Sequence, residues 1–194
     1  MIDSLFVSQS SPTGPTWTLT TRMGDILQEL ERKYGPRDLT YTPLGVEFHG
    51  DIPHIWYPGN CKHVAIRLSM AALPNPSRAL YQLAHECVHL LSPSGGSAAP
   101  VLEEGLATIF SEDYALRICK QHFTPELPAY ASAAADLREL LEIEPFAVER
   151  LRNVEPAFYK MGLETFVQAG LGEVPANLRD RLLMPFSDFR TKLG

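Results

Sequence analysis

The pattern of apolar and polar positions divides the chain into a sheet-forming first part and a helical second part. Between residues 21 and 34 the apolar side chains recur at helical spacing and stop at Gly35-Pro36, which predicts an amphipathic helix. Short segments separated by Gly and Pro follow, and they predict strands at 39–42, 46–49, 54–57 and 63–68. Residues 1–20, rich in Ser, Thr and Pro, predict an extended arm.

The segment 63–68 alternates most regularly. Its pattern places Val64, Ile66 and Leu68 on one side of the strand, and the intervening residues on the other. The strand precedes the helix that carries the candidate chemistry described below. It is therefore either an edge strand that could pair with an extended peptide or an ordinary interior strand.

From residue 76 onward the pattern is helical. One helix is expected from Pro76 to about Leu91, a second from Val101 to about Lys120, and further segments, divided by prolines, at 126–144, 146–153, 157–170 and 176–191. Because the strands come first and the helices later, an α+β fold is expected. We expect a single domain over 1–194, with a small mixed or antiparallel sheet and its backing helix in 1–75 and a mainly helical part in 76–194.

Composition narrows the functional classes. A chain of 194 residues with 45% hydrophobic content can bury a core, and its net charge of −6, without a Lys/Arg cluster, disfavours nucleic acid as a partner. Cys61, Cys87 and Cys119 are odd in number and widely spaced, which predicts free thiols in a reducing compartment. The chain has no signal-like start and no apolar run of membrane-spanning length, so we expect a cytoplasmic protein without membrane contact. The oligomeric state is not indicated.

The candidate chemistry lies in the predicted helix 76–91. His85, Glu86 and His89 form the pattern H-E-x-x-H, in which two histidines one turn apart share a helix face and can bind one metal ion, most simply zinc. Glu86 could then act as general base on a water molecule at the open position of the ion. Asn75 as N-cap and Pro76 at the first helical position support the helix. Alternatively, the H-E-x-x-H pattern could occur by chance in a helical protein that binds no zinc.

A catalytic zinc site needs a third protein ligand. A metzincin would carry histidine six residues after His89, but Gly95 stands there. The next acidic residues are Glu103 and Glu104, and the glycine-rich loop before them allows the chain to return past the two histidines. Periodicity alone does not choose between these two glutamates. Alternatively, both glutamates could lie in solvent in the first turn of a helix, where acidic side chains suit the helix dipole.

The segment Val101-Leu102-Glu103-Glu104-Gly105-Leu106-Ala107-Thr108 resembles W-L-N-E-G-F-A-S of the gluzincin metallopeptidases, in particular their zinc aminopeptidases. The resemblance implies a zincin-like fold comparable to a minimal thermolysin-like catalytic domain, with Glu104 as the third zinc ligand. It also covers Phe158-Tyr159-Lys160-Met161-Gly162, which is similar to P-Y-E-K-G of the same group and implies that the Tyr159 hydroxyl stabilises the oxyanion. Other candidate donors are Tyr114, His122 and Tyr130.

The sequence departs from the gluzincin pattern at several positions, and these departures limit which family properties the resemblance implies. The chain has no G-x-M-E-N run, with which the aminopeptidases hold a free amino terminus. Thr108 replaces a second-shell aspartate of the thermolysin-like enzymes, so a carboxylate orienting His85 would have to come from Glu112 or Asp113. The sequence thus predicts a zinc metallopeptidase acting on a peptide or protein substrate. A non-catalytic zincin-scaffold protein that binds a peptide is the alternative.

Overall fold

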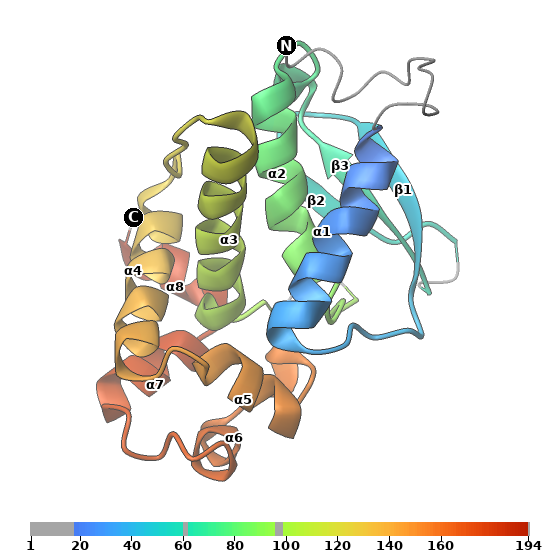
Figure 1. The fold of residues 1–194 in the computed structure, drawn as a ribbon. Helices are drawn as coiled ribbons and strands as arrows, with labels where there is room; N and C mark the ends of the chain where they lie inside the picture. The colour runs from blue at the N-terminus through green and yellow to red at the C-terminus, as the bar shows by residue number, and fades with distance from the viewer. Residues whose placement is uncertain (1–17, 60–61, 96–98, 194) are drawn as a thin grey trace.

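The structure is a computed structural model that describes residues 18–59, 62–95 and 99–193. Within these residues the chain has the expected α+β composition, with a small mixed sheet near the N-terminus followed by helices (Figure 1). Most of the predicted arm at residues 1–20, and Cys61, lie outside the described residues. Cys87 and Cys119 are buried and unpaired, as the sequence predicts. No helix in the described part of the chain is long and apolar enough to cross a membrane.

The sheet has three strands in the order β1-β3-β2, with bounds β1 Thr42–Phe48, β2 His54–Trp56 and β3 His63–Leu68. β1 runs parallel to β3, whereas β2 runs antiparallel to it. Val64, Ile66 and Leu68 are at most 1% exposed, which confirms the predicted alternation. β3 is therefore the interior strand, and β2 is an edge strand.

The strand predicted at 39–42 is wrong. Leu39 is 74% exposed, and the chain turns at this point instead of extending. The carboxylate of Asp38 accepts a hydrogen bond from the Thr40 backbone N–H at 2.9 Å, and the Asp38 carbonyl accepts one from Tyr41. This local turn satisfies backbone groups that a strand would have paired with a neighbour, because Asp side chains readily bond to the backbone two residues on.

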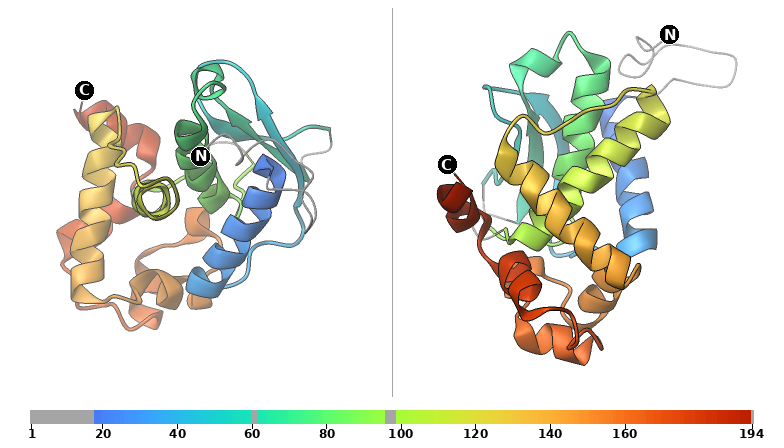
Figure 2. Two further views of the ribbon diagram at one scale, coloured as in Figure 1. Left: turned by 45° about the horizontal axis from the view of Figure 1, so that its top comes forward. Right: turned by 90° about the vertical axis from the view of Figure 1, so that its left-hand side faces the viewer.

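Two helices pack against one face of the sheet, α1 (Leu19–Tyr34) and α2 (Pro76–His89) (Figure 2). α1 begins two residues earlier than expected because Thr18 caps it, its side chain accepting from the Thr21 N–H. α2 begins as predicted, with the Asn75 side chain accepting a hydrogen bond from the Arg78 N–H and Pro76 in the first turn. The apolar stripe of α2 is fully buried, so the opposite side of the helix remains for function.

The long helix α3 (Val101–Cys119) lies between α2 and α4 (Pro128–Ile143), as Figures 1 and 2 show. Close approach of α3 to α4 depends on Gly105. A Cβ atom at this position would lie 2.5 Å from the carbonyl oxygen of Ala133. The glycine next to the candidate ligand Glu104 therefore has a packing role of its own.

In the C-terminal part, α5 (Ala147–Val154) matches the predicted segment 146–153 to within one residue. The elements after it are shorter than the sequence predicts: the 3-10 helix η3 (Phe158–Lys160), α6 (Leu163–Gln168), α7 (Ala176–Leu183) and α8 (Phe186–Leu193). The helix predicted over 176–191 is broken at Pro185, which cannot donate to the helical ladder. Here the chain instead pairs with the segment before α3, because Val101 N–H donates to the Met184 carbonyl and Phe186 N–H to the Ala99 carbonyl, both at 2.9 Å.

Candidate metal centre

The two histidines of the H-E-x-x-H sequence occupy the last turns of α2, where they face the first turn of α3. His85 and His89 are one helical turn apart, and their ring centroids are separated by 5.3 Å. Both side chains are mostly buried, with exposed fractions of 14% and 12%. The imidazoles therefore converge instead of pointing apart, as the spacing predicts.

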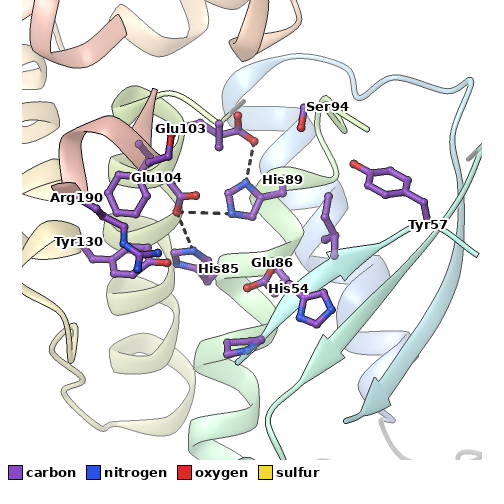
Figure 3. Close-up of a pocket in the computed structure, with 15 residues that line it drawn as sticks. His54, Tyr57, His85, Glu86, His89, Ser94, Glu103, Glu104, Tyr130 and Arg190 are labelled. Atoms are coloured by element: carbon purple, nitrogen blue, oxygen red, sulfur yellow. Dashed lines mark hydrogen bonds and ion pairs between the residues drawn. The ribbon is translucent and has the colours of Figure 1, made fainter. Parts of the chain in front are cut away.

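The third group comes from the first turn of α3. Glu104 Oε2 lies 3.3 Å from Nε2 of His85 and 3.8 Å from Nε2 of His89 (Figure 3). The ligand atoms of these three residues all lie within 4.8 Å of one another. The structure thus brings Glu104, and not Glu103, together with both Nε2 atoms.

Glu103 contacts the other nitrogen of His89. Its Oε1 is 2.8 Å from Nδ1 of His89, so that Nδ1–H donates to the carboxylate and Nε2 faces Glu104. Glu103 is only 2% exposed. Burial raises the pKa of Glu103, and the contact with His89 offsets only part of that effect. The side chain that the sequence offered as an alternative ligand is therefore a hydrogen-bond partner of His89.

The electrostatics of the cluster follow from its burial and its close charges. Burial alone would lower the pKa of His89, but the carboxylates of Glu104 and Glu103 outweigh burial and raise it to about 10. Burial likewise favours the neutral form of Glu104, yet His89 and His85 hold the pKa of its carboxyl below the usual value. The cluster therefore stabilises a carboxylate at Glu104, the ionisation state that metal ligation requires.

Glu86, the middle acid of the motif, is 4% exposed. Burial raises the pKa of its carboxyl, and the nearby Glu104 carboxylate adds to that effect, whereas His85 and His89 oppose it. Glu86 lines the same pocket as the two histidines. A carboxyl group with a raised pKa next to a candidate metal site is suited to taking up and releasing a proton.

The cluster lies in a pocket of about 300 Å³. Figure 3 shows its walls, to which the sheet edge, the loop after α2 and the C-terminal helix contribute. Beyond the cluster itself, the pocket is lined by Pro53, His54, Ile55, Tyr57, Ser94, Ala99, Tyr130, Phe186, Ser187 and Arg190. The edge strand β2, not β3, therefore borders the cluster.

Tyr159 is not among the residues that line this pocket. It belongs to η3, and its side chain is 37% exposed. The oxyanion role that the resemblance implied for Tyr159 is therefore not supported, because the P-Y-E-K-G-like segment folds outside the pocket lining. Of the other tyrosine candidates, Tyr130 from α4 does line it, and its ring meets the edge of His85 with centroids 5.6 Å apart.

Several pocket residues had no signal in the sequence. His54 and Tyr57 lie on or beside β2, and Arg190 lies on α8, far from the motif along the chain. The Tyr57 hydroxyl accepts a hydrogen bond from the Gly95 N–H at 3.0 Å and thereby ties the loop after α2 to the sheet. The expected orienting groups Glu112 and Asp113 pair elsewhere, with Arg138 and Arg117. Only the tertiary fold brings the other wall residues to the motif.

The chemistry of His85, His89 and Glu104 fits a metal ion. Two imidazoles and a carboxylate are the protein ligands of many catalytic zinc sites, in which bonds of about 2.0–2.1 Å place ligand atoms roughly 3.3 Å apart. Oε2 of Glu104 is buried, and its contacts with Nε2 of His85 and His89, at 3.3 and 3.8 Å, form no well-aligned hydrogen bond. Since buried polar atoms rarely lack a hydrogen bond, this oxygen is a candidate for ligation. His85, His89 and Glu104 could therefore hold a metal ion.

Comparisons of the chain with models of known protein families, with curated proteins and with solved structures found no match. The described residues and their geometry are thus the basis for assigning a function. They establish an α+β fold and a His85–His89–Glu104 group with Glu86 at a pocket.

Proposed function

We propose that the protein is a zinc-dependent metallopeptidase of the gluzincin type. The observation that carries the proposal is the convergence of His85, His89 and Glu104 within 4.8 Å at a pocket that Glu86 also lines. Two imidazoles and one carboxylate are the protein ligands of many catalytic zinc sites, in which a further position is kept for water, whereas closed structural sites use four protein ligands. The proposed substrate is a peptide or protein.

The arrangement of the elements supports a zincin-like fold as part of this proposal. α2 carries the H-E-x-x-H sequence along one face of a small mixed sheet, and α3 returns beside it with Glu104 in its first turn. An edge strand, β2, borders the pocket. An extended peptide could thus approach the metal group from the sheet side.

The chemical steps assign a role to each residue. A bound zinc ion would supply a Lewis acid that polarises a water molecule and the scissile carbonyl. His85, His89 and Glu104 would hold it, and the Glu103 carboxylate would keep His89 in the tautomer that presents Nε2. Glu86 accepts the proton of the attacking water and transfers it to the leaving amine. The raised pKa of Glu86 suits this second, acidic step.

Tyr130 replaces Tyr159 as the proposed donor to the oxyanion. Its ring lies against His85, and it lines the pocket together with Glu86. Burial, together with Glu104 and Glu86, raises the pKa of its hydroxyl, so the phenol keeps the proton that it would donate. Donors of this kind are commonly worth a factor of about 100 to 1000 in rate.

Hydrolysis of a peptide library by the zinc-loaded protein tests the proposal. We expect cleavage that a chelator abolishes and added zinc restores.

Glu86→Gln should lower kcat by at least about a hundredfold while zinc stays bound, because only the proton acceptor is lost. Tyr130→Phe should lower kcat with zinc binding retained, and Tyr159→Phe is the matched control that keeps wild-type turnover. Zinc binding without any cleavage would contradict the peptidase and favour a non-catalytic peptide-binding protein.

A further inference from the structure

Arg190 is a positive charge in a pocket whose other ionisable groups are mainly acids and histidines. It lies on α8, and its side chain lines the pocket with Tyr130 and Glu104 (Figure 3). Among the described residues no hydrogen bond or ion pair engages its guanidinium. Glu103 pairs with His89, and Glu104 pairs with the two histidine Nε2 atoms. Arg190 acts on Glu104 through its charge alone, which helps to lower the pKa of that carboxyl. Arg190 therefore remains available to a ligand.

The fold holds α8 at the pocket by contacts of several kinds. The backbone before α8 pairs with the backbone before α3, through Val101 with Met184 and Phe186 with Ala99. Phe186 also packs on the Tyr130 ring with centroids 4.8 Å apart. Phe186 and Arg190 are four residues apart, so they share one face of the helix. The packing that orients Phe186 toward the pocket thus orients Arg190 as well.

We propose that Arg190 selects substrates by binding a carboxylate, so that the enzyme prefers peptides with an acidic group close to the scissile bond. This inference rests on the proposed peptidase function and names its substrate class. A guanidinium presents a planar pair of N–H donors that match the two oxygens of a carboxylate. In a peptide, that carboxylate is either the C-terminus or an Asp or Glu side chain.

Four hexapeptide pools separate the two sources. The first pool has a free C-terminus and lacks Asp and Glu, and the second is its amidated counterpart. The third is amidated and contains Glu, and the fourth contains Gln instead. Preference for the first over the second identifies a C-terminal carboxylate, and preference for the third over the fourth an acidic side chain. We expect at least one of these ratios, measured by mass spectrometry of the products, to be about tenfold or more.

The variant Arg190→Met should reduce that ratio to about one, and Arg190→Lys should leave an intermediate value because the charge remains without the fork. Lys192→Met is the matched control, since it removes an exposed positive charge from the same helix, outside the pocket lining, and should keep the wild-type ratio. A wild-type protein without either preference, or an Arg190→Met protein that keeps it, overturns the inference.

A binding measurement separates failure of this inference from failure of the peptidase proposal. The Glu86→Gln protein, incubated with the four pools and recovered by ultrafiltration, should retain carboxylate peptides over their neutral counterparts, and Arg190→Met in that background should abolish the difference. If the wild-type protein cleaves nothing, the peptidase proposal fails while retention still decides the role of Arg190. If cleavage occurs but retention ignores the carboxylate, the role of Arg190 fails alone.

Discussion

The two nitrogens of the His89 ring meet two different carboxylates from adjacent residues. Glu103 approaches Nδ1 at 2.8 Å, whereas Glu104 lies 3.8 Å from Nε2. Neighbouring residues in a helix project about 100° apart, so one glutamate can reach each side of the ring. Sequence periodicity could not separate their roles, because the choice depends on how α3 is rotated against α2.

The contact between Glu103 and His89 predicts a loss of metal affinity without loss of the ligands. Glu103→Gln should weaken zinc binding about 10- to 100-fold, because an amide holds the imidazole tautomer less strongly than a carboxylate does. Glu112→Gln is the control on the same helix, since its partner is Arg138. Competition titration against a fluorescent chelator measures both. Equal affinity in wild type and Glu103→Gln would exclude the orienting role.

The charge of His89 predicts how zinc affinity depends on pH. With its pKa raised to about 10 by Glu104 and Glu103, the imidazole carries a proton at neutral pH when no ion is bound. Zinc must displace this proton, so its apparent affinity should rise with pH, about tenfold per unit for one proton. Calorimetry in buffers of different ionisation enthalpy, between pH 6 and 8, counts the released protons. An affinity independent of pH would contradict this charge state.

At the scale of the elements, the approach of α3 to α4 places Glu104 and Tyr130 in one pocket. Gly105→Ala should separate these helices, because the new Cβ would lie 2.5 Å from the Ala133 carbonyl oxygen. We expect a loss of about 1–3 kcal/mol in the free energy of unfolding. Gly24→Ala in α1, where a Cβ meets nothing within 4 Å, should instead stabilise by about 0.5–1 kcal/mol. Urea unfolding compares them, and equal effects would refute the packing argument.

The end of α1 is joined to α5 by Arg152, which is only 4% exposed. Its guanidinium donates to the carbonyls of Tyr34, Gly35 and Pro36, and burial lowers its pKa to about 10. Arg152→Met leaves these partly buried carbonyls without the charged donor, and it should cost about 2–4 kcal/mol.

The matched control is Arg150→Met. Arg150 pairs with Glu144 at a partly exposed position, and losing that pair should cost no more than about 1 kcal/mol. Thermal unfolding followed by calorimetry distinguishes the two variants of α5. Similar midpoints for both would show that Arg152 does not hold the two helices together.

Across the whole molecule, the sequence predicts the features that neighbouring residues determine, such as helix starts and helix faces. It misses the features that packing between distant segments determines, such as strand order and pocket walls. Asn75 and Pro76 predict the start of α2, and the spacing of His85 and His89 predicts their shared face, because helix geometry alone determines both. The interior position of β3 and the bridge between Pro100 and Pro185 depend on pairing with distant backbone. For the same reason, the sequence assigned the oxyanion role to Tyr159, whereas the fold brings Tyr130 to the pocket.

In the proposed site, three side chains from two helices bind one zinc ion beside Glu86. The most direct measurement is the zinc content of purified protein after equilibrium dialysis against zinc, determined by mass spectrometry. We expect one zinc per chain in the wild type and in Glu86→Gln, and far less in His85→Ala and Glu104→Ala. A wild-type protein without zinc, or a Glu104→Ala protein that retains zinc with unchanged affinity, would contradict the proposed zinc site.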